Sequence, residues 1–169
     1  MIQIVTQPNE QIGAFVSQMQ GGNHLPWGQF TSIGLVRDGE LIAGVIYNNW
    51  SAANVCMHVA ALPGRMWLVP EYLYAIFDYP FNEHNLRRVT GIVPKKNAAA
   101  RRLDEHVGFK LEGSLRHALP HDDLLVYGML RRECRFITDD YLAKVRSRLI
   151  CSTGGPNGHV RQGQSATCA

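Results

Sequence analysis

The segment Arg88–Gly113, RVTGIVPKKNAAARRLDEHVGFKLEG, decides the expected fold. Its first seven residues form a mostly apolar run, which predicts a strand over 88–94. Asn97 is a favourable N-cap residue, and the spacing of apolar residues after it predicts a helix over 98–106. Gly108 is placed to end that helix, and a second strand begins at Phe109. The segment therefore predicts a strand–helix–strand unit, which is typical of a mixed α/β fold.

The rest of the chain extends this unit into a larger sheet. Two strand-like runs, 30–37 and 40–48, flank Asp38–Gly39, and that dipeptide between apolar runs is a strong hairpin signal. Further strands are predicted over 1–5, 55–61, 109–115 and 124–130, and further helices over 9–20, 67–84 and 138–149. The order β-α-β-β-β-α-β-α-β-β predicts an α/β (α+β) fold, in which helices flank a mixed central sheet of six to seven strands.

Length and composition limit the domain organisation. The 169 residues, 46% of them hydrophobic, suffice for one domain, predicted over 1–150. Residues 151–169 contain almost no large apolar side chain, so we expect a flexible C-terminal tail there. The net charge of +3 comes without any Lys/Arg run longer than two residues, which argues against a nucleic-acid surface.

The chain carries no sequence signal for export, membrane insertion or metal binding. No apolar run approaches the roughly 20 residues of a membrane helix, and the N-terminus lacks the pattern of a secretory signal. The four cysteines are widely spaced and form no Cys-x-x-Cys pair. We therefore expect a cytoplasmic protein with reduced thiols, no metal and no membrane partner.

The segment that decides the fold also carries a family resemblance. Its pattern is similar to the C-terminal half of the GNAT N-acetyltransferases at Asn97, Arg101–Leu103, Gly108–Phe109 and Glu112–Gly113. The branch that acetylates ribosomal proteins and protein N-termini has a similar run, N-x-x-[SA]-x-[RK]-[LV] followed by G-F-x-x-E-G. The predicted order of elements over 1–136 is also that of the GNAT fold. Two further segments, 79–81 and 133–136, look like a phage-borne subgroup of this family.

The resemblance implies a site for acetyl-CoA as cosubstrate. In the GNAT family the strand that corresponds to 54–61 and the next helix hold acetyl-CoA, and N–H groups at the helix start bind the pyrophosphate. The implied cofactor contacts lie at Val59, Ala60, Ala61, Gly64, Arg65, Met66, Trp67, Asn97, Arg101 and Arg102. The family motif [QR]-x-x-G-x-[GA] is not matched, because this chain has ALPGRMW over 61–67 and keeps one glycine. An ordinary turn at Pro63–Gly64 is the alternative interpretation.

Three of these residues have alternative roles in the helix that follows 88–94. The side-chain amide of Asn97 bridges pantetheine amides in the similar acetyltransferases, but asparagine is equally a plain N-cap residue, and both roles are compatible. Arg101 and Arg102 either reach phosphate oxygens or line a solvated helix face, which is the commoner environment of arginine.

Acetyl transfer to an amine requires a base, donors for the developing negative charge and a proton for the departing thiolate. His58 is the first candidate for the base because imidazole titrates in the useful range, and an inert histidine on a half-buried strand is the alternative. Glu71 and Glu112 are further candidates. Many GNAT enzymes use a tyrosine in the helix after Asn97 as the acid, and this chain has none there. Tyr127 is the nearest replacement by type, with a core aromatic residue as the alternative.

These features leave three functions open. The first is an acetyl-CoA-dependent N-acetyltransferase that transfers acetyl directly to a primary amine, on a protein N-terminus, a lysine or a small molecule. The second is a non-catalytic acyl-CoA-binding or interaction module, which the altered loop and the missing tyrosine favour. The third is a mixed α/β domain that binds another anion. A dimer is the expected oligomer, if the chain forms one.

Overall fold

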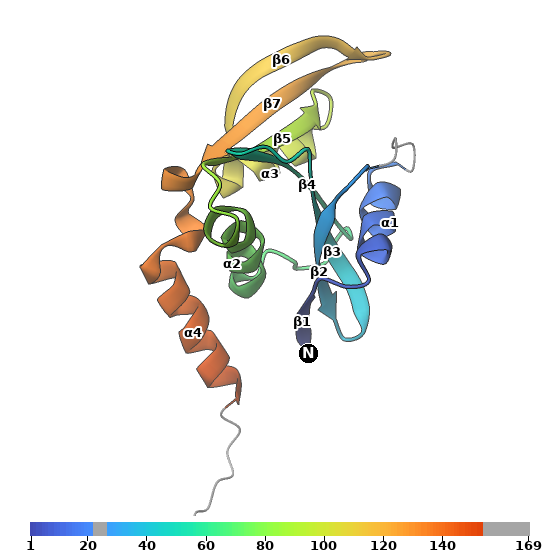
Figure 1. Ribbon diagram of the computed structural model, residues 1–169. Coiled ribbons are helices and arrows are strands. Elements are labelled where there is room, and N and C mark those ends of the chain that lie inside the picture. The colour runs from blue at the N-terminus through green and yellow to red at the C-terminus, as the bar shows by residue number, and fades with distance from the viewer. Residues whose placement is uncertain (22–26, 154–169) are drawn as a thin grey trace, which may run out of the picture.

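The computed structural model describes residues 1–21 and 27–153, with side chains described as far as Arg148. Figure 1 shows strands and helices in the predicted order. The strands are β1 (Ile2–Val5), β2 (Thr31–Arg37), β3 (Glu40–Asn48), β4 (Asn54–Ala61), β5 (Arg88–Pro94), β6 (Lys110–Leu119) and β7 (Asp122–Leu130). The α-helices are α1 (Asn9–Met19), α2 (Pro70–Asp78), α3 (Ala98–Val107) and α4 (Asp139–Thr153). The tail predicted over 151–169 lies outside the described residues from 154 onward, and 151–153 complete α4 instead.

The seven strands form one mixed sheet in the order β1-β2-β3-β4-β5-β7-β6. Every neighbouring pair is antiparallel except β4 and β5, which are parallel. This topology confirms the predicted mixed architecture and its upper strand number. The Asp38–Gly39 turn joins β2 and β3 as predicted, and both residues have the positive φ that this tight hairpin needs. No helix in the described residues is long and apolar enough to span a membrane.

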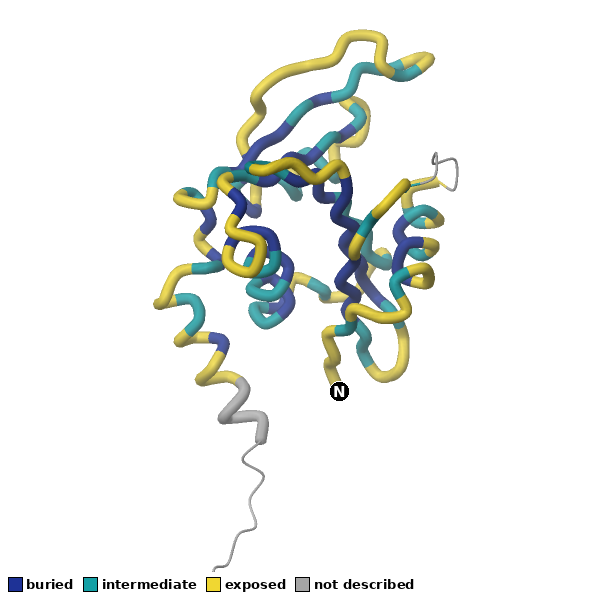
Figure 2. Tube along the Cα trace, viewed as in Figure 1, coloured by how far each residue is buried: buried dark blue, intermediate teal, exposed yellow. Residues whose placement is uncertain are grey.

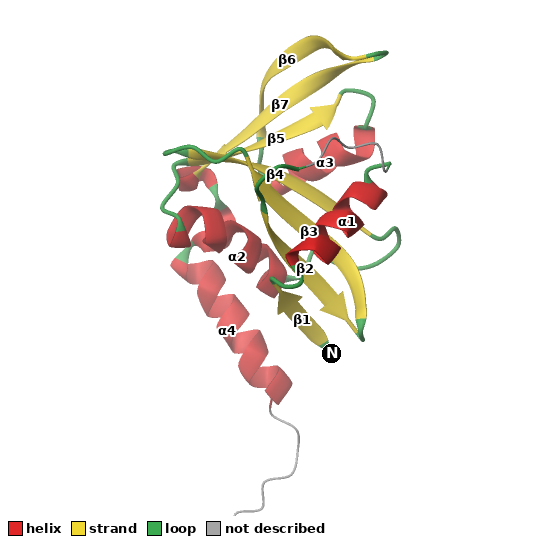
Figure 3. Cartoon of the chain, turned by 45° about the vertical axis from the view of Figure 1, so that its right-hand side comes forward, coloured by secondary structure: helices red, strands yellow, loops and turns green. Residues whose placement is uncertain are grey.

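Helices cover both faces of the sheet, as Figure 3 shows. On one face, which we call the α1 face, α1 approaches β3 closely at Gly44. A Cβ on Gly44 would lie 2.9 Å from Val16 Cγ2 and 3.1 Å from Ile12 Cγ2, so a glycine is needed for this contact. On the other face, the α2 face, α2 and α3 pack against the second half of the sheet. The side chains of the candidate site are described below by the face of the sheet, α1 or α2, on which they lie.

The main hydrophobic core lies on the α2 face, where Figure 2 shows buried segments of strands and helix together. Strand residues alternate between faces, so the odd-numbered residues of β4 and β5 point into this core and the even-numbered ones toward α1. Its aromatic members are Tyr47, Tyr72, Phe77, Phe81, Phe109, Tyr127 and Phe136. Full burial of one such apolar side chain contributes about 1.5–3 kcal/mol.

Helix α2 is shorter than the helix predicted from the sequence. It begins at Pro70, a favourable first position for proline, and is followed by a π-helical turn over Tyr79–Glu83. Pro80 has no N–H to donate to the Ile76 carbonyl one turn earlier, so the α-helical pattern stops there. The Tyr47 hydroxyl donates to that carbonyl at 2.6 Å, and this buried bond satisfies it. The predicted start at 67 is thus corrected to Pro70, whereas the early end of the α-helix at Pro80 agrees with what a proline inside a helical pattern predicts.

The hairpin of β6 and β7 is longer than predicted, because the expected polar loop is mostly strand and only Pro120–His121 join the two. Figure 1 shows the hairpin arching beyond the rest of the sheet. Asp122 Oδ2 accepts from the backbone N–H of Lys96 at 2.9 Å. Asp123 Oδ1 accepts from the backbone N–H of His117 at 3.0 Å. These bonds fix the hairpin turn and tie it to the connection between β5 and α3.

Candidate active site

Strands β4 and β5 begin side by side and then separate. Their register covers only three residue pairs, from Asn54–Arg88 to Cys56–Thr90. Beyond that point β4 continues beside β3 alone, and β5 continues beside β7 alone. The sheet therefore contains an opening between two strand edges at their carboxyl ends. We call it the β4–β5 gap.

Backbone groups of β4 point into this gap. The Leu62 N–H donates to the Ile42 carbonyl of β3 at 2.8 Å. Residues of an antiparallel pair alternate between bonding their partner strand and facing away from it, so the backbone groups of Val59 and Ala61 face the gap. Ala60, between them, bonds β3. Two of the three strand residues predicted to contact acetyl-CoA thus present their backbone to the gap.

The opposite edge of the gap carries backbone groups as well. The Lys95 N–H donates to the Asp123 carbonyl near the start of β7 at 2.9 Å, and by the same alternation the backbone of Ile92 faces β4. At the α1 end of the opening, Gln20 Nε2 donates to the Val59 carbonyl at 3.2 Å. The gap is therefore lined on both sides by main-chain groups that suit an extended, amide-bearing ligand.

A narrow cavity of about 20 Å³, with room for about one water, adjoins the gap on the α2 face. Its walls come from both separated strands and both covering helices. They comprise Met57, Val59, Trp67, Leu73, Ile76, Phe77, Gly91, Leu103, Asp104, Val107 and Phe109. All of these but Asp104 are apolar, so a ligand in the gap would contact a mostly apolar surface on the α2 face.

Asp104 on α3 is the carboxylic acid in this cavity wall. Its Oδ2 atom is buried and has no hydrogen-bond partner within the described part of the chain. A Cβ on Gly91 would lie 3.5 Å from Oδ2, so the carboxyl group lies against β5. Burial, and then the neighbouring Glu105 charge, raise the pKa of Asp104 to about 7. This group can therefore hold or release a proton near neutral pH.

Sequence reasoning missed Asp104. The available signal was its position: it follows Ala100 by four residues and precedes Val107 by three, which places an acid on the inward side of the helix. A lone acid on such a face is unusual unless a partner or a function stabilises it.

His58 lies on β4, as predicted, with its side chain on the α1 face. Its Nε2 is 3.0 Å from Asn48 Oδ1, and its ring centre is 4.9 Å from that of Trp27. The Trp27 Nε1–H donates to Ser17 Oγ of α1 at 2.7 Å. These contacts hold a half-buried imidazole beside the gap, on the face opposite Asp104.

The predicted acid Tyr127 is fully buried on β7, directly opposite Gly91 in the register. Its hydroxyl donates to Glu105 Oε1 at 3.0 Å. Burial raises the pKa of Tyr127, and the Glu105 charge adds to the rise while Arg101 opposes it. The phenol therefore keeps its proton at neutral pH, and that proton already has an acceptor.

The other two candidate bases, Glu112 and Glu71, form ion pairs. Arg88 Nη2 lies 2.6 Å from Glu112 Oε2, and the same guanidinium donates to Thr90 Oγ1 at 3.2 Å. Glu71 faces α4, where its carboxylate lies 3.5 Å from Arg148 Nε. Neither carboxylate lines the cavity beside the gap.

The loop predicted to hold the pyrophosphate is not the start of a helix. Gly64 has the left-handed φ of a turn, but α2 begins only at Pro70, so 65–67 form an irregular connection. The expectation of helical N–H groups directly after Gly64 is therefore corrected. The cause lies in Pro70 itself, which sets the first helical position.

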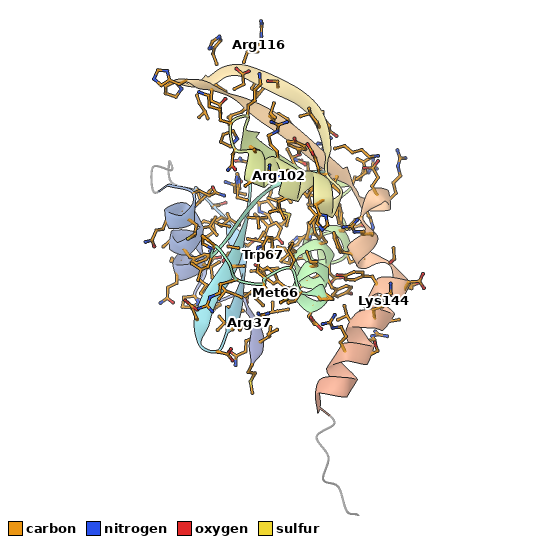
Figure 4. All side chains as sticks on the ribbon, turned by 180° about the vertical axis from the view of Figure 1, so that it is seen from behind. Arg37, Met66, Trp67, Arg102, Arg116 and Lys144 are labelled. Atoms are coloured by element: carbon orange, nitrogen blue, oxygen red, sulfur yellow. The ribbon has the colours of Figure 1, made fainter. Side chains whose placement is uncertain are left out.

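Side chains of this loop point in different directions, as Figure 4 shows for Met66 and Trp67. Trp67 lines the cavity beside the gap, whereas Met66 is 72% exposed. Arg65 is exposed too and forms an ion pair with Glu40 at 2.5 Å. The loop thus contributes the apolar side chain of Trp67 to the cavity wall and the exposed guanidinium of Arg65 to the surface.

The residues predicted on α3 divide by exposure. Asn97 is the N-cap, and its Oδ1 accepts from the Ala100 N–H at 3.0 Å, which confirms the capping role. Arg101 is half-buried: Nη1 donates to the Lys95 carbonyl at 3.3 Å, and Nε is buried without a partner among the described residues. Arg102 is exposed, as expected for a solvated helix face (Figure 4). Their ligand roles stay predictions.

No family model matches this chain, and no curated protein matches its sequence. Solved structures do match its fold. A GNAT-family acetyltransferase from Bacillus anthracis is similar with a TM-score of 0.59 at 19% identity, over 78% of this chain and 96% of that one. Spermidine N-acetyltransferase from Vibrio cholerae, in complex with CoA and spermine, is similar with a TM-score of 0.64 at 14% identity, over 81% and 98%.

Campylobacter jejuni PseH, an N-acetyltransferase in complex with acetyl-CoA, is similar with a TM-score of 0.56 at 13% identity, over 78% of this chain and 99% of that one. Likeness at these identities shows the fold alone. The chain therefore has the fold of the GNAT acetyltransferases.

Proposed function

We propose that this protein is an acetyl-CoA-dependent N-acetyltransferase that transfers acetyl directly to a primary amine. The β4–β5 gap carries the proposal, because it is a break in a sheet where both strand edges face each other without pairing. An extended ligand with amides can bond such an edge as an added strand would. Pantetheine, the arm of CoA, is such a ligand. Two proteins of this fold were solved with CoA or acetyl-CoA, which supports the same use here.

The surroundings of the gap fit the parts of acetyl-CoA. Backbone groups of Val59 and Ala61 would bond the pantetheine amides, and the apolar wall at Trp67 would cover its methylene groups. Arg102 on α3 is an exposed cation available to phosphate oxygens, and Arg65 on the loop before α2 could reach them by leaving its ion pair with Glu40. All five of these residues were expected from the sequence to contact acetyl-CoA. The difference is that side-chain cations, and not N–H groups at a helix start, would bind the phosphates.

Two proton transfers of the reaction would take place on opposite faces of the sheet. On the α1 face, His58 would take a proton from the ammonium form of the acceptor, which leaves a lone pair to attack the acetyl carbon. The Val59 N–H would donate to the acetyl oxygen as negative charge develops there. As the new C–N bond forms, the nitrogen would release its second proton to water, and as the C–S bond breaks, protonated Asp104 would give its proton to the sulfur from the α2 face. Tyr127 remains the alternative donor, although its proton is bonded to Glu105.

The acceptor side has a chemical character of its own. The walls nearest His58 come from α1, β2, β3 and β4, and the sequence has no Asp or Glu over 11–37 or 41–70. A polyamine acceptor carries several positive charges and needs carboxylates to replace its water. We infer that the acceptor carries a single amine, such as a peptide N-terminus, and that spermidine is a poor acceptor.

CoA release from acetyl-CoA tests this function. We would compare lysine-free peptides with an unblocked N-terminus, the same peptides blocked by acetylation, and spermidine. The expected result is release with unblocked peptides, none with blocked ones, and much slower release with spermidine. Equal or faster release with spermidine would overturn the acceptor class. No release with any amine would overturn the enzyme assignment.

A second candidate is a non-catalytic acyl-CoA-binding module. It is favoured by the loop at Gly64, which lies six residues before α2 and does not form a helix N-terminus. This candidate predicts saturable CoA binding without turnover in the same assay, so binding and release measured together separate the two functions.

A further inference from the structure

A second cavity lies at the other end of the sheet, where β5 begins and β7 ends. Its volume is about 660 Å³, within the range of small-molecule sites. Its lining comprises Asn82, Arg87, Leu130, Arg131, Arg132, Cys134, Ile137 and Thr138. Since β5 has seven residues at about 3.3 Å each, this cavity lies roughly 20 Å from the open end of the β4–β5 gap. It is therefore distinct from the site proposed for acetyl-CoA.

Three arginines on this cavity wall lack acidic partners. Arg87, Arg131 and Arg132 form no ion pair within the described residues. The nearest acid in sequence, Glu133, is bound instead by Lys110 at 2.6 Å. Asp139 and Asp140, after the Thr138 lining residue, form no ion pair with them either. The three guanidinium groups therefore lack a directly paired carboxylate, although the Arg132 charge also acts on Glu133 and helps to lower the pKa of that carboxyl.

One of the arginines is held in place by neutral groups. Arg131 Nη1 donates to Asn85 Oδ1 at 2.7 Å, and Nη2 donates to Asn82 Oδ1 at 2.8 Å. The Arg131 N–H also donates to the Arg87 carbonyl at 2.9 Å, which fixes the two backbones together. Neutral amides orient a guanidinium without neutralising it, so its charge stays available and less entropy is lost on binding an oxyanion.

Besides the arginines, Asn82 and Thr138, the lining is apolar. Leu130, Cys134 and Ile137 form this part of the wall, and the Cys134 thiol is buried. A bare inorganic ion would leave this surface in water, whereas a ligand with an organic body would cover it. The combination of three cations with an apolar wall selects a ligand that has both an anionic head and an apolar part.

We propose that this cavity binds a small organic phosphate, with its phosphate oxygens on Arg87, Arg131 and Arg132 and its organic part on Leu130 and Ile137. Guanidinium forks match phosphate oxygens in geometry and charge. The ligand would join the turn after α2, the end of β7 and the start of α4, and so stabilise the folded chain. The site is independent of catalysis at the β4–β5 gap.

Calorimetric titration with ATP, pyrophosphate and citrate, without CoA, tests the proposal, and variants of the cavity arginines separate binding here from binding at the gap. The test variant is Arg87→Ala with Arg132→Ala. The control variant, Arg37→Ala with Arg116→Ala, removes the same charge elsewhere; Figure 4 shows these two arginines at opposite ends of the molecule. Both variants should keep the wild-type melting temperature to within a few degrees, because the four substituted side chains lie outside the hydrophobic core.

The expected result is saturable ATP binding that is tighter than pyrophosphate binding, weakens as salt is raised, and falls at least tenfold in the test variant but not in the control. Three results would overturn the proposal: no saturable binding of either phosphate compound, equal binding by wild type and test variant, or binding of citrate alone, which would assign the site to carboxylates.

Discussion

Asp104 is the residue on which the proposed chemistry depends most. Its carboxyl group is on the inward side of α3, its Oδ2 is buried without a partner among the described residues, and β5 runs past it at Gly91. An ionised carboxylate in such a place is costly, because no donor replaces the water it has lost. The same environment raises the pKa of Asp104 to about 7 and makes it a proton donor at neutral pH.

The first prediction concerns turnover. Asp104→Asn removes the proton and keeps the shape, so we expect kcat to fall about 100-fold with the KM for acetyl-CoA unchanged. The wild-type rate should also fall as pH rises through about 7, where the donor is lost, and the variant should lack this decline. Asp140→Asn, at an exposed acid on α4 away from the gap, is the control. Wild-type kcat in the Asn variant would remove Asp104 from the mechanism.

The second prediction concerns stability. The unfolded chain releases the Asp104 proton near pH 4, whereas the folded chain keeps it to about pH 7, so the folded state binds more protons between these values. Stability therefore falls as pH rises through this window. Asp104→Asn should be about 1 kcal/mol more stable than wild type at pH 8 and show no such gain at pH 4, after allowance for solvent screening. Urea unfolding at both pH values measures this, and an equal difference at both would contradict it.

The third prediction separates the two roles of Asn97. Asn97→Ala removes the hydrogen bond to the Ala100 N–H and should cost about 1 kcal/mol of stability. Asn97→Ser keeps a capping oxygen and should restore the stability, but it lacks the side-chain amide that we expect to bridge pantetheine. Both variants should bind CoA several-fold more weakly in a calorimetric titration. Wild-type affinity for CoA in the Asn97→Ser variant would show that Asn97 is a helix cap and not a CoA contact.

At the level of elements, the separation of β4 and β5 is the feature that creates the site. The sequence predicts both strands within one residue of their ends, because each is a short apolar run with clear boundaries. It does not predict that they pair over only three residues, since pairing depends on what packs on either side. The gap is thus a property of tertiary packing, and the sequence indicates it only through the family resemblance.

Helix α2 shows a similar limit. The periodicity over 67–84 is helical throughout, so pattern alone predicts one continuous helix. Pro80 indicates in the sequence that the helix bends or ends early. The outcome also depends on Tyr47, which lies 29 residues before Ile76 and whose hydroxyl donates to the Ile76 carbonyl. A break that is compensated by a distant side chain cannot be located from local preferences.

The fourth prediction uses two glycines inside strands. Gly44→Ala would place a Cβ 2.9 Å from Val16 Cγ2 between α1 and β3, and overpacking there should cost about 1–3 kcal/mol. Gly91→Ala would meet its nearest neighbour, Asp104 Oδ2, at 3.5 Å, an ordinary contact, and should leave stability unchanged or slightly raised. Thermal unfolding of both variants compares them directly. Equal losses would show that α1 does not pack as closely as the structure has it.

At the level of the whole molecule, two cavities lie at opposite ends of a mixed sheet, and only one belongs to the proposed reaction. The sequence predicts the fold well because hairpin, cap and helix-end signals agree along the chain. It predicts the site less well, because His58, Asp104 and the gap come from three elements whose relation is set by packing. The sequence does not predict the arginine cavity. Arg87 and Arg131 are distant in sequence, and each has the pattern of an ordinary surface cation.

Hydrogen–deuterium exchange with and without saturating acetyl-CoA tests the central claim, that the β4–β5 gap is the acyl-CoA site. The account predicts that the backbone N–H groups of Val59 and Ala61 exchange quickly in the unliganded protein, because they face the gap. It predicts strong protection over 57–62 on binding, with little change in β1 and β2. Binding that leaves 57–62 unprotected, or no binding at millimolar acetyl-CoA, would contradict it.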